Sequence, residues 1–516
     1  MPIDLLSSTD SGGYSSDPSR PDYACPAYRE MAPRWALVDD VRAGTEAIRA
    51  KRTTYLPKFE AETPKDWDTR VLMTFAEDHY ATTLTEHVGL VMAEPITLGD
   101  DVLPAIEELC EDIDGEGNHL DVFAHTAFDA ALHYGHVVLV TDYPEATNIK
   151  TKRDAKVAHV RPYVQLYPAP DVLCPEGVSI GGVKVLTRIM LREHDTAPAG
   201  EFGLAGVTRY RELRQAVEYD EFTGRARSLG AITWRTWRAD PDAAAGTGFT
   251  PTGEGAIIGP ARIPARVVYG GEKLGFVHTK PHLYGLALAN LEETQVKSDY
   301  ANVMHKTNVP TPIFIGRNSS ATQGQTLQMG QGIDIPIGGD AKMLEPSGAA
   351  IGETRLRLAA LRTDMQRQGA STAQGEGGKT LTATEAAQYA KARNAKLRRS
   401  ARSLQDALEG VLADMAAFLG IATTGAVKSG GSLSVCQDFT GEAIDPAYLT
   451  VLVAAYKEGT LSMEELRAAI HTGKLPDDFK AEDSGALIAA EIARQDQAAA
   501  DAAAQAARAA PPPTVA

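Results

Sequence analysis

The stretch PHLYGLALANLEETQVKSDYANVMHKTN, residues 281–308, decides the fold of this chain. Its apolar residues recur every three or four positions, which indicates one long helix with a broad apolar stripe. Pro281 suits the first turn of a helix, whereas Pro310 and Pro312 prevent the helix from continuing. At about 1.5 Å per residue, the predicted rod is roughly 42 Å long.

A small β segment and two further helices are predicted after this rod. The pieces PIFIG and QGIDIPIGGDAKMLEP predict the β segment, and residues 351–368 predict a second helix. The run GASTAQGEGGKT, residues 369–380, is typical of a loop. Thr382 and Glu385 then match a capping box, which predicts the start of the longest helix, to about residue 419. Its apolar residues are spaced for helix-on-helix packing: Leu397, Ala401, Leu404, Leu408, Val411 and Met415.

The first half of the chain combines helices with strands. Helices are predicted at 28–49, with Gly44 interrupting, at 67–92 and at 120–134. Gly135 ends the third helix, and HVVLVTDYP follows as a buried strand. The next region is β-rich, and residues 246–259 are predicted to be a loop within it. Its strands lie in VAHVRPYVQLY, GVKVLTRIML, VTRYRELRQAVEYD and AITWRTWRAD. These patterns together predict the α+β class.

Composition limits the range of functions. The chain has 516 residues, which suggests roughly three domains. Hydrophobic residues make up 43%, enough for a sizeable core, so wholesale disorder is excluded. Lys and Arg total 51 against 68 Asp and Glu, a formal net charge of −17. Proteins that grip DNA by neutralising phosphates usually have the opposite balance, so we expect no tight hold on DNA over a broad surface.

The cysteines and the N-terminus point to a protein that stays where it is made. Four cysteines lie at positions 25, 110, 174 and 436, with no CxxC pair and no disulfide framework, so buried reduced thiols are expected. No run of 18 apolar residues occurs, and no membrane span is predicted. The first 23 residues lack the basic start and apolar core of a signal peptide and are interpreted as a flexible polar arm.

One glycine-rich motif raises the question of nucleotide binding. Residues 373–380, AQGEGGKT, fit a permissive phosphate-loop pattern, in which Lys379 reaches the outer phosphates and Thr380 holds magnesium. This chemistry requires a strand that runs into the loop, whereas the element predicted before it is the amphipathic helix 351–368. The strand VVLVTD, which ends at Asp142, lies far upstream. A mobile loop between two helices is therefore favoured over nucleotide binding.

Other candidate sites are weaker. His125, His133 and His136 lack the i, i+4 spacing that places metal ligands on one helix face, so ordinary hydrogen-bonded histidines are expected. No GxSxG elbow, HExxH helix or EF-hand loop occurs, and no pair of carboxylates stands out as acid and base. A basic run on the long helix faces solvent, a neighbouring subunit or DNA: Lys391, Arg393, Lys396, Arg398, Arg399 and Arg402.

Several stretches resemble the portal proteins of tailed bacteriophages, the subunits of the head-to-tail connector ring. The most specific is GFVHTKPHLYGLALANLEETQVKSDYANVMHKTNVPTPIFIG, residues 275–316, with its Pro-punctuated strand. YLP near Tyr55, the helix–Gly135–VVLVTDYP unit, RPYVQLYPAPDVL and TATEA are further points of resemblance. The resemblance spans roughly residues 28–494.

This resemblance implies an α/β wing, a two-helix stem, a small β-containing clip, a long wing helix and a helical crown. It divides the chain into a flexible arm (1–27), a helical and then β-rich wing (28–280), a first stem helix (281–309), a clip (310–350), a second stem helix (351–368), a tunnel loop (369–381), the long helix (382–420), a crown (421–495) and an Ala/Pro-rich tail (496–516).

The resemblance also implies a non-enzymatic subunit of a ring, generally of twelve copies, at one vertex of the virion capsid, assembled in the host cytoplasm. The implied partners are the chain itself, viral double-stranded DNA held weakly and without sequence preference, the terminase large subunit, the major capsid protein and a head–tail adaptor. No cofactor, metal, membrane or catalytic residue is implied. The residues implied to line the DNA channel are Lys379, Gly375, Gly377, Gly378, Glu292 and Glu293.

Two other functions stay open at this point. One is a P-loop NTPase of a DNA-handling machine that uses Lys379 and Thr380. The other is a helical scaffold or minor capsid protein that never closes a ring. A weakly adhesive channel agrees with the acidic composition, because affinity for DNA grows steeply with each phosphate contact and firmly held DNA could not slide.

Overall fold

The computed structural model describes residues 14–60, 62–144, 160–239, 248–307, 311–315, 340–344, 349–369, 383–421, 430–437, 446–457 and 466. The chain divides into two compact units, Met1–Gln437 and Asp438–Ala516. The first unit mixes helices and sheets, in agreement with the predicted α+β class. In the second unit, the helix α11 (Pro446–Lys457) is described. No described helix is long and apolar enough to span a membrane.

The N-terminal helices follow the prediction at one point and depart from it at another. Gly44, with a φ of 76°, separates α1 (Pro26–Ala43) from α2 (Thr45–Ala50), as predicted. The single helix predicted at 67–92 is wrong, because the chain forms α3 (Pro64–Met73) and α4 (His79–Val91). Thr74 is extended at the end of α3, and its hydroxyl bonds with Ser298 Oγ at 2.8 Å. A contact with the distant helix that contains Ser298 therefore accompanies the break between α3 and α4. The apolar periodicity of the sequence did not indicate this break.

A three-stranded antiparallel sheet lies in the middle of the first unit. Its central strand, β2 (His136–Asp142), pairs with β3 (Tyr163–Pro168) and with β9 (Ala265–Tyr269). The helix α6 (Leu120–Tyr134) precedes β2 and ends at Gly135, as predicted. Gly135 has a φ of 98°, and a Cβ there would lie 2.6 Å from Thr279 Oγ1, so both conformation and space require glycine.

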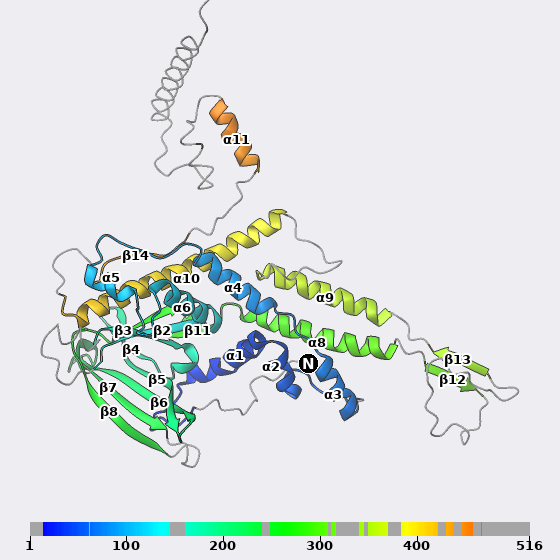
Figure 1. The fold of residues 1–516 in the computed structure, drawn as a ribbon, viewed down its shortest axis with the longest axis horizontal. Coiled ribbons are helices and arrows are strands. Elements are labelled where there is room, and N and C mark those ends of the chain that lie inside the picture. Colours follow the sequence, from blue (N-terminus) through cyan, green and yellow to red (C-terminus); the bar gives the residue numbers. More distant parts are fainter. Residues whose placement is uncertain are drawn as a thin grey trace, which may run out of the picture. The chain divides into compact units, whose positions relative to one another are not determined.

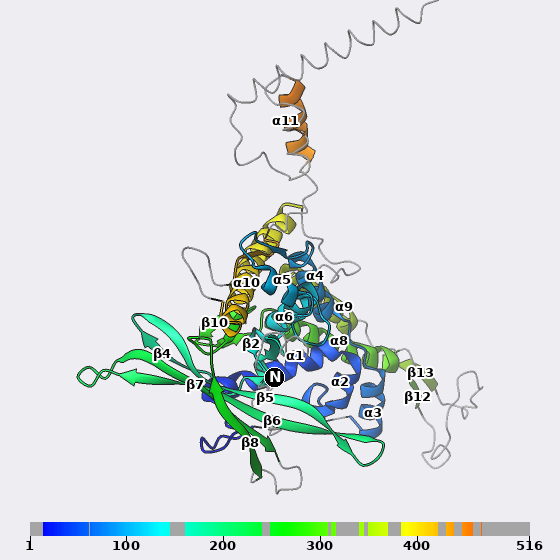
Figure 2. The same ribbon diagram turned by 60° about the vertical axis from the view of Figure 1, so that its left-hand side comes forward.

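Five antiparallel strands form a second sheet, in which each strand pairs with the next in sequence (Figures 1 and 2). They are β4 (Glu176–Ile180), β5 (Val183–Ala199), β6 (Gly203–Tyr219), β7 (Ala226–Ala239) and β8 (Phe249–Ile257). The loop predicted at 246–259 is wrong, because most of it is β8, which pairs with β7 from Ile257 to Phe249. The loop was predicted because glycine and Pro251 are typical of loops. In the structure, β8 is an edge strand, where proline is tolerated, and Gly253 lies against the ring of Trp234.

Several small elements complete this part of the first unit. The hairpin of β10 (Glu272–Gly275) and β11 (His278–Lys280) leads into the rod helix. The strand β1 (Thr97–Leu98) pairs with β14 (Leu433–Ser434), and α5 (Pro104–Cys110) follows β1. The 3₁₀ turns are η2 (Arg52–Thr54) and η3 (Ala169–Asp171).

The rod predicted first in the sequence is α8 (Tyr284–Thr307), and it packs side by side with α9 (Ala349–Arg367) (Figure 1). Between them in sequence, β12 (Thr311–Ile315) and β13 (Asp340–Leu344) form an antiparallel pair. The order of a rod, a small β segment and a second rod is therefore confirmed. The names stem and clip for these segments stay a prediction.

The longest helix is α10 (Ala383–Phe418), with 36 residues. All six residues of the predicted apolar seam are fully buried: Leu397, Ala401, Leu404, Leu408, Val411 and Met415. Their main packing partner is β9 of the three-stranded sheet, however, and not another helix as predicted. Arg266 of β9 binds Asp414 of α10 at 2.7 Å, which fixes the helix across the sheet. The capping box at Thr382 lies outside the described residues.

Candidate functional site

The structure describes two of the six residues predicted to line a channel. Glu292 and Glu293 are neighbours on α8. Gly375, Gly377, Gly378 and Lys379 lie outside the described residues. The segment 370–382 that contains them connects α9 to α10, so the described element before it is a helix and not a strand. A phosphate loop requires a strand before it, whereas the described element before this segment is the helix α9.

Glu292 and Glu293 differ sharply in their surroundings. The Glu292 side chain is 43% exposed and forms an ion pair with Arg357 of α9. The Glu293 side chain is 1% exposed. The Glu293 carboxylate therefore binds cations of the same chain. That Glu292 and Glu293 line a channel stays a prediction.

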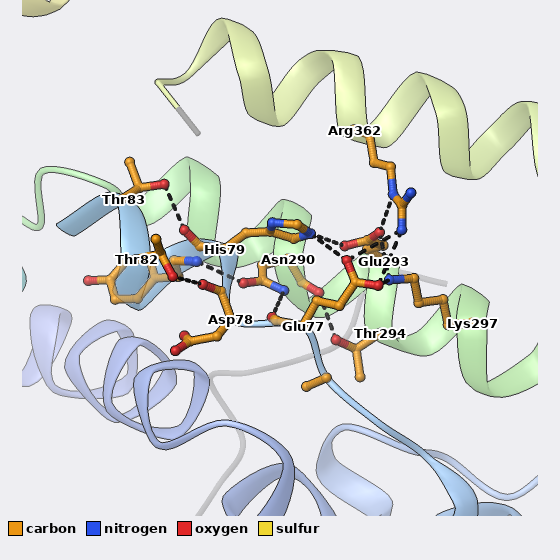
Figure 3. Close-up of polar contacts among 12 residues, drawn as sticks. Glu77, Asp78, His79, Thr82, Thr83, Asn290, Glu293, Thr294, Lys297 and Arg362 are labelled. Atoms are coloured by element: carbon orange, nitrogen blue, oxygen red, sulfur yellow. Dashed lines mark hydrogen bonds and ion pairs between the residues drawn. The ribbon is translucent and has the colours of Figure 1, made fainter. Parts of the chain in front are cut away.

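Glu293 is the centre of a charged cluster that joins three parts of the chain (Figure 3). We name it the Glu293 cluster and define it as Glu77, His79, Glu293, Lys297 and Arg362. Lys297 Nζ lies 2.9 Å from Glu293 and also contacts Glu77, and Arg362 Nε of α9 donates to Glu293 at 2.8 Å. His79 Nε2 lies 2.9 Å from Glu77 and 3.3 Å from Glu293. The cluster thus links α8, α9 and the start of α4.

The charges of the cluster balance one another. Two carboxylates face two permanent cations, and the imidazole of His79 lies between the carboxylates. Burial disfavours the charged form of Glu293, but hydrogen bonds from His79, Arg362 and Lys297 outweigh it and lower the pKa of Glu293 to about 2. For Glu77, burial is likewise outweighed, here by the Lys297 ammonium, so the pKa of Glu77 is also lowered. Both carboxylates are ionised at neutral pH.

The same residue types raise the question of a metal centre. Ligand atoms of Glu77, His79 and Glu293 lie within 4.8 Å of one another. The Lys297 ammonium and the Arg362 guanidinium already occupy both carboxylates, and a divalent cation there would meet their positive charge. We therefore interpret the cluster as a structural lock between helices.

Asn290 extends this lock by one helical turn. Its Oδ1 accepts a hydrogen bond from the backbone N–H of Tyr80 at 3.0 Å, and its Nδ2 donates to the carbonyl of Glu77 at 2.9 Å. Asn290 therefore satisfies backbone groups at the start of α4, where free N–H groups need partners. This role was not predicted from the sequence, although Asn290, Glu293 and Lys297 share one face of α8 by their spacing.

A second lock joins α3 to α8. The Arg70 side chain is 3% exposed and makes two hydrogen bonds to Glu62, at 2.8 and 3.0 Å, and one to the carbonyl of Pro57 at 2.7 Å. Arg70 also lies 3.5 Å from Asp299, next to Ser298, within the stretch 275–316 that resembles portal proteins most specifically. A cavity of about 380 Å³ between α3 and α8 borders this lock.

Two of the three histidines considered as metal ligands have separate hydrogen-bond partners. His133 bonds with the hydroxyl of Tyr80 and with Asp39, both at 2.9 Å. His136 Nδ1 bonds with Thr279 Oγ1 at 2.8 Å, and burial lowers the pKa of His136 to about 3. His125 is exposed on α6. Ordinary hydrogen-bonded histidines therefore describe His133 and His136.

Three arginines of the basic run on α10 make hydrogen bonds within the chain. Arg398 and Arg402 donate to the backbone carbonyl and the side chain of Gln437, and Arg399 donates to the carbonyl of Gly271. The side chains of Lys391 and Arg393 lie outside the described residues.

Comparisons with known proteins show what this chain is similar to. Residues 282–419 match the model of a family described as a domain of unknown function, DUF4055, which covers about a quarter of the chain, from just before α8 to just after α10. No curated protein matches.

Among solved structures, the chain is similar to one described as the neck of an empty gene transfer agent particle computed with C6 symmetry, at 13% identity, with 78% of this chain and 90% of that chain covered and a TM-score of 0.37. It is similar to a chain of the virion of a native gene transfer agent particle, at 11% identity, 83% and 99% coverage and a TM-score of 0.38. A third is described as the neck of the native particle computed with C12 symmetry, at 11% identity, 83% and 98% coverage and a TM-score of 0.34. At these TM-scores the likenesses carry no argument about function.

Proposed function

We propose that the chain is the subunit of a portal ring in a tailed bacteriophage, the channel through which DNA is packaged and ejected. The observation that carries the proposal is the unit formed by α8, the β12–β13 pair, α9 and α10. Two packed rods joined through a small β pair, followed by a long helix across a sheet, are what the resemblance implies for stem, clip and wing. The terminase large subunit, the major capsid protein and a head–tail adaptor are the proposed docking partners.

Electrostatics supports a channel role in a specific way. A subunit that lines a DNA channel must keep its rods rigid without presenting many cations, because each phosphate contact adds to the affinity. The Glu293 cluster meets both needs, since it holds α8 against α9 with buried charges that neutralise one another. The net charge of −17 agrees with a channel in which DNA slides.

A ring of identical subunits needs a head-to-tail interface, and this makes oligomeric state the first test. Negative-stain images of the purified full-length chain should show annular particles with a central hole, with twelve-fold symmetry in the virion. Particles without a hole, or a monodisperse monomer at micromolar concentration, would favour the scaffold or minor capsid alternative and contradict the portal proposal.

A second test addresses the segment between α9 and α10. Deleting residues 375–378 should leave ring assembly intact and reduce DNA packaging or retention, because the proposal places this segment beside DNA. Loss of ring assembly in the deletion variant would mean that the segment serves a different purpose. The P-loop alternative predicts saturable ATP binding that Lys379→Ala abolishes, and a filter-binding assay with that variant separates the two functions.

A further inference from the structure

Two cysteines that are far apart in sequence meet beside the N-terminus of α1. Cys25 directly precedes α1, and Cys174 follows η3 and precedes β4. The backbone N–H of Cys25 donates to the carbonyl of Leu173 at 3.1 Å, which places the chain of Cys25 next to that of Cys174. Both residues belong to the same hydrophobic cluster, in which Cys174 is buried and Cys25 packs against it. The Cys174 thiol donates to Glu176 Oε1 at 3.8 Å. All four cysteines of the chain are free.

Both backbones are held in place at this contact. Leu173 N–H donates to the carbonyl of Met190 at 2.9 Å, and Val172 forms an antiparallel bridge with Leu191, so the segment before Cys174 is anchored to β5. On the other side, Ala24 is fully buried, and Cys25 is fixed by its bond to Leu173. Disulfide formation requires closely spaced backbones, and a cavity of about 40 Å³ borders Cys25.

The two thiols differ in reactivity. The neighbouring Cys174 side chain lowers the pKa of Cys25, in spite of partial burial, and the backbone N–H groups of Tyr28 and Ala27 add to this effect. The neighbouring Cys25 side chain and burial raise the pKa of Cys174. Cys25 is only partly buried, whereas Cys174 is buried. Cys25 is thus the nucleophile of the pair, and Cys174 the thiol that reacts second.

We propose that Cys25 and Cys174 form a redox-sensitive thiol pair, which a low-molecular-weight disulfide such as oxidised glutathione converts into an intramolecular disulfide. The Cys25 thiolate attacks one sulfur of oxidised glutathione, forms a mixed disulfide and releases one glutathione thiolate, which takes up a proton. The Cys174 thiol then loses its proton and attacks the Cys25 sulfur, which releases the second glutathione. Two protein thiols and one disulfide become one protein disulfide and two glutathione molecules.

The bond would close a loop of about 150 residues, which ties the start of α1 to the β-rich part of the first unit. In a reducing compartment the pair stays open, and in an oxidising medium it closes. This inference is independent of the proposed portal function, since it rests on the neighbouring backbones of Cys25 and Cys174 and on their shared hydrophobic cluster.

The test uses the native full-length chain equilibrated with oxidised glutathione at low protein concentration, followed by alkylation and peptide mass mapping. The expected product is a peptide pair linked through Cys25 and Cys174, reversed by dithiothreitol. Native alkylation of Cys25 by iodoacetamide should be at least about tenfold faster than that of Cys110, because burial raises the pKa of Cys110 to about 11.

Single variants separate the two steps of the reaction. In Cys174→Ser, Cys25 should accumulate as a mixed disulfide with glutathione, whereas in Cys25→Ser, Cys174 should stay a free thiol. The matched control Cys110→Ser should form the Cys25–Cys174 bond as the wild type does. Wild-type protein that carries stable mixed disulfides without the linked peptide pair, or that forms only bonds between chains, would overturn the inference.

Discussion

Neutralising Glu293 should destabilise the protein much more than neutralising its neighbour Glu292. Glu293→Gln removes a carboxylate that is 1% exposed and leaves Lys297 and Arg362 with one partner fewer. Breaking a buried ion pair by removing one partner costs about 3–5 kcal/mol. The control Glu292→Gln affects an exposed pair with Arg357 and should cost less than about 1 kcal/mol.

The pKa of Glu293 gives a second route to the same magnitude. The hydrogen bonds from His79, Arg362 and Lys297 lower this pKa to about 2 in the folded chain, from an ordinary value of 4.5. At about 1.4 kcal/mol per pKa unit, this difference corresponds to about 3 kcal/mol of stability. Because the folded-state pKa is the lower one, this contribution is complete above pH 4.5 and disappears as the pH falls towards 2. The wild type should therefore lose its advantage over Glu293→Gln on acidification.

The assay is urea unfolding at pH 7 and pH 3, followed by tryptophan fluorescence at one fixed protein concentration, since assembly would shift the apparent stability. All four tryptophans lie in the first unit, at positions 35, 67, 234 and 237. At pH 3 the difference between wild type and Glu293→Gln should shrink to roughly half or less of its value at pH 7. Equal losses in the Glu292 and Glu293 variants, or a difference that does not change with pH, would refute the reasoning.

Three further substitutions test the packing and the backbone geometry of the first unit. Arg70→Met leaves the buried Glu62 carboxylate without its cation and should cost about 3–5 kcal/mol in urea unfolding, whereas the control Arg367→Met, in an exposed pair, should cost less than about 1 kcal/mol. Similar losses in both variants would contradict the role of Arg70 as a lock. Gly270→Ala should destabilise by more than about 2 kcal/mol, because its Cβ would lie 2.2 Å from the carbonyl oxygen of Ala131. Gly89→Ala, in α4 with no atom within 4 Å of the new Cβ, should instead stabilise by about 0.5–1 kcal/mol, and a loss at this position would count against the backbone geometry of α4.

The sequence by itself determined the features that depend on neighbouring residues. Helical spacing predicted the six buried residues of α10, and Gly135 marked the end of α6 because a left-handed residue favours glycine. The rod, β segment and second rod followed from proline and glycine positions and from apolar periodicity. Each of these signals acts within a few residues along the chain, so it can be detected without knowledge of the fold.

Only the tertiary structure decided which partners those elements meet. The break between α3 and α4 coincides with a bond between Thr74 and Ser298, more than 200 residues away, and β8 is a strand because it pairs with β7 across its whole length. Periodicity also could not separate the exposed Glu292 from the buried Glu293, or bring Cys25 beside Cys174. These contacts join segments that are distant in sequence, and their free energy depends on burial and geometry that arise only when the chain has folded.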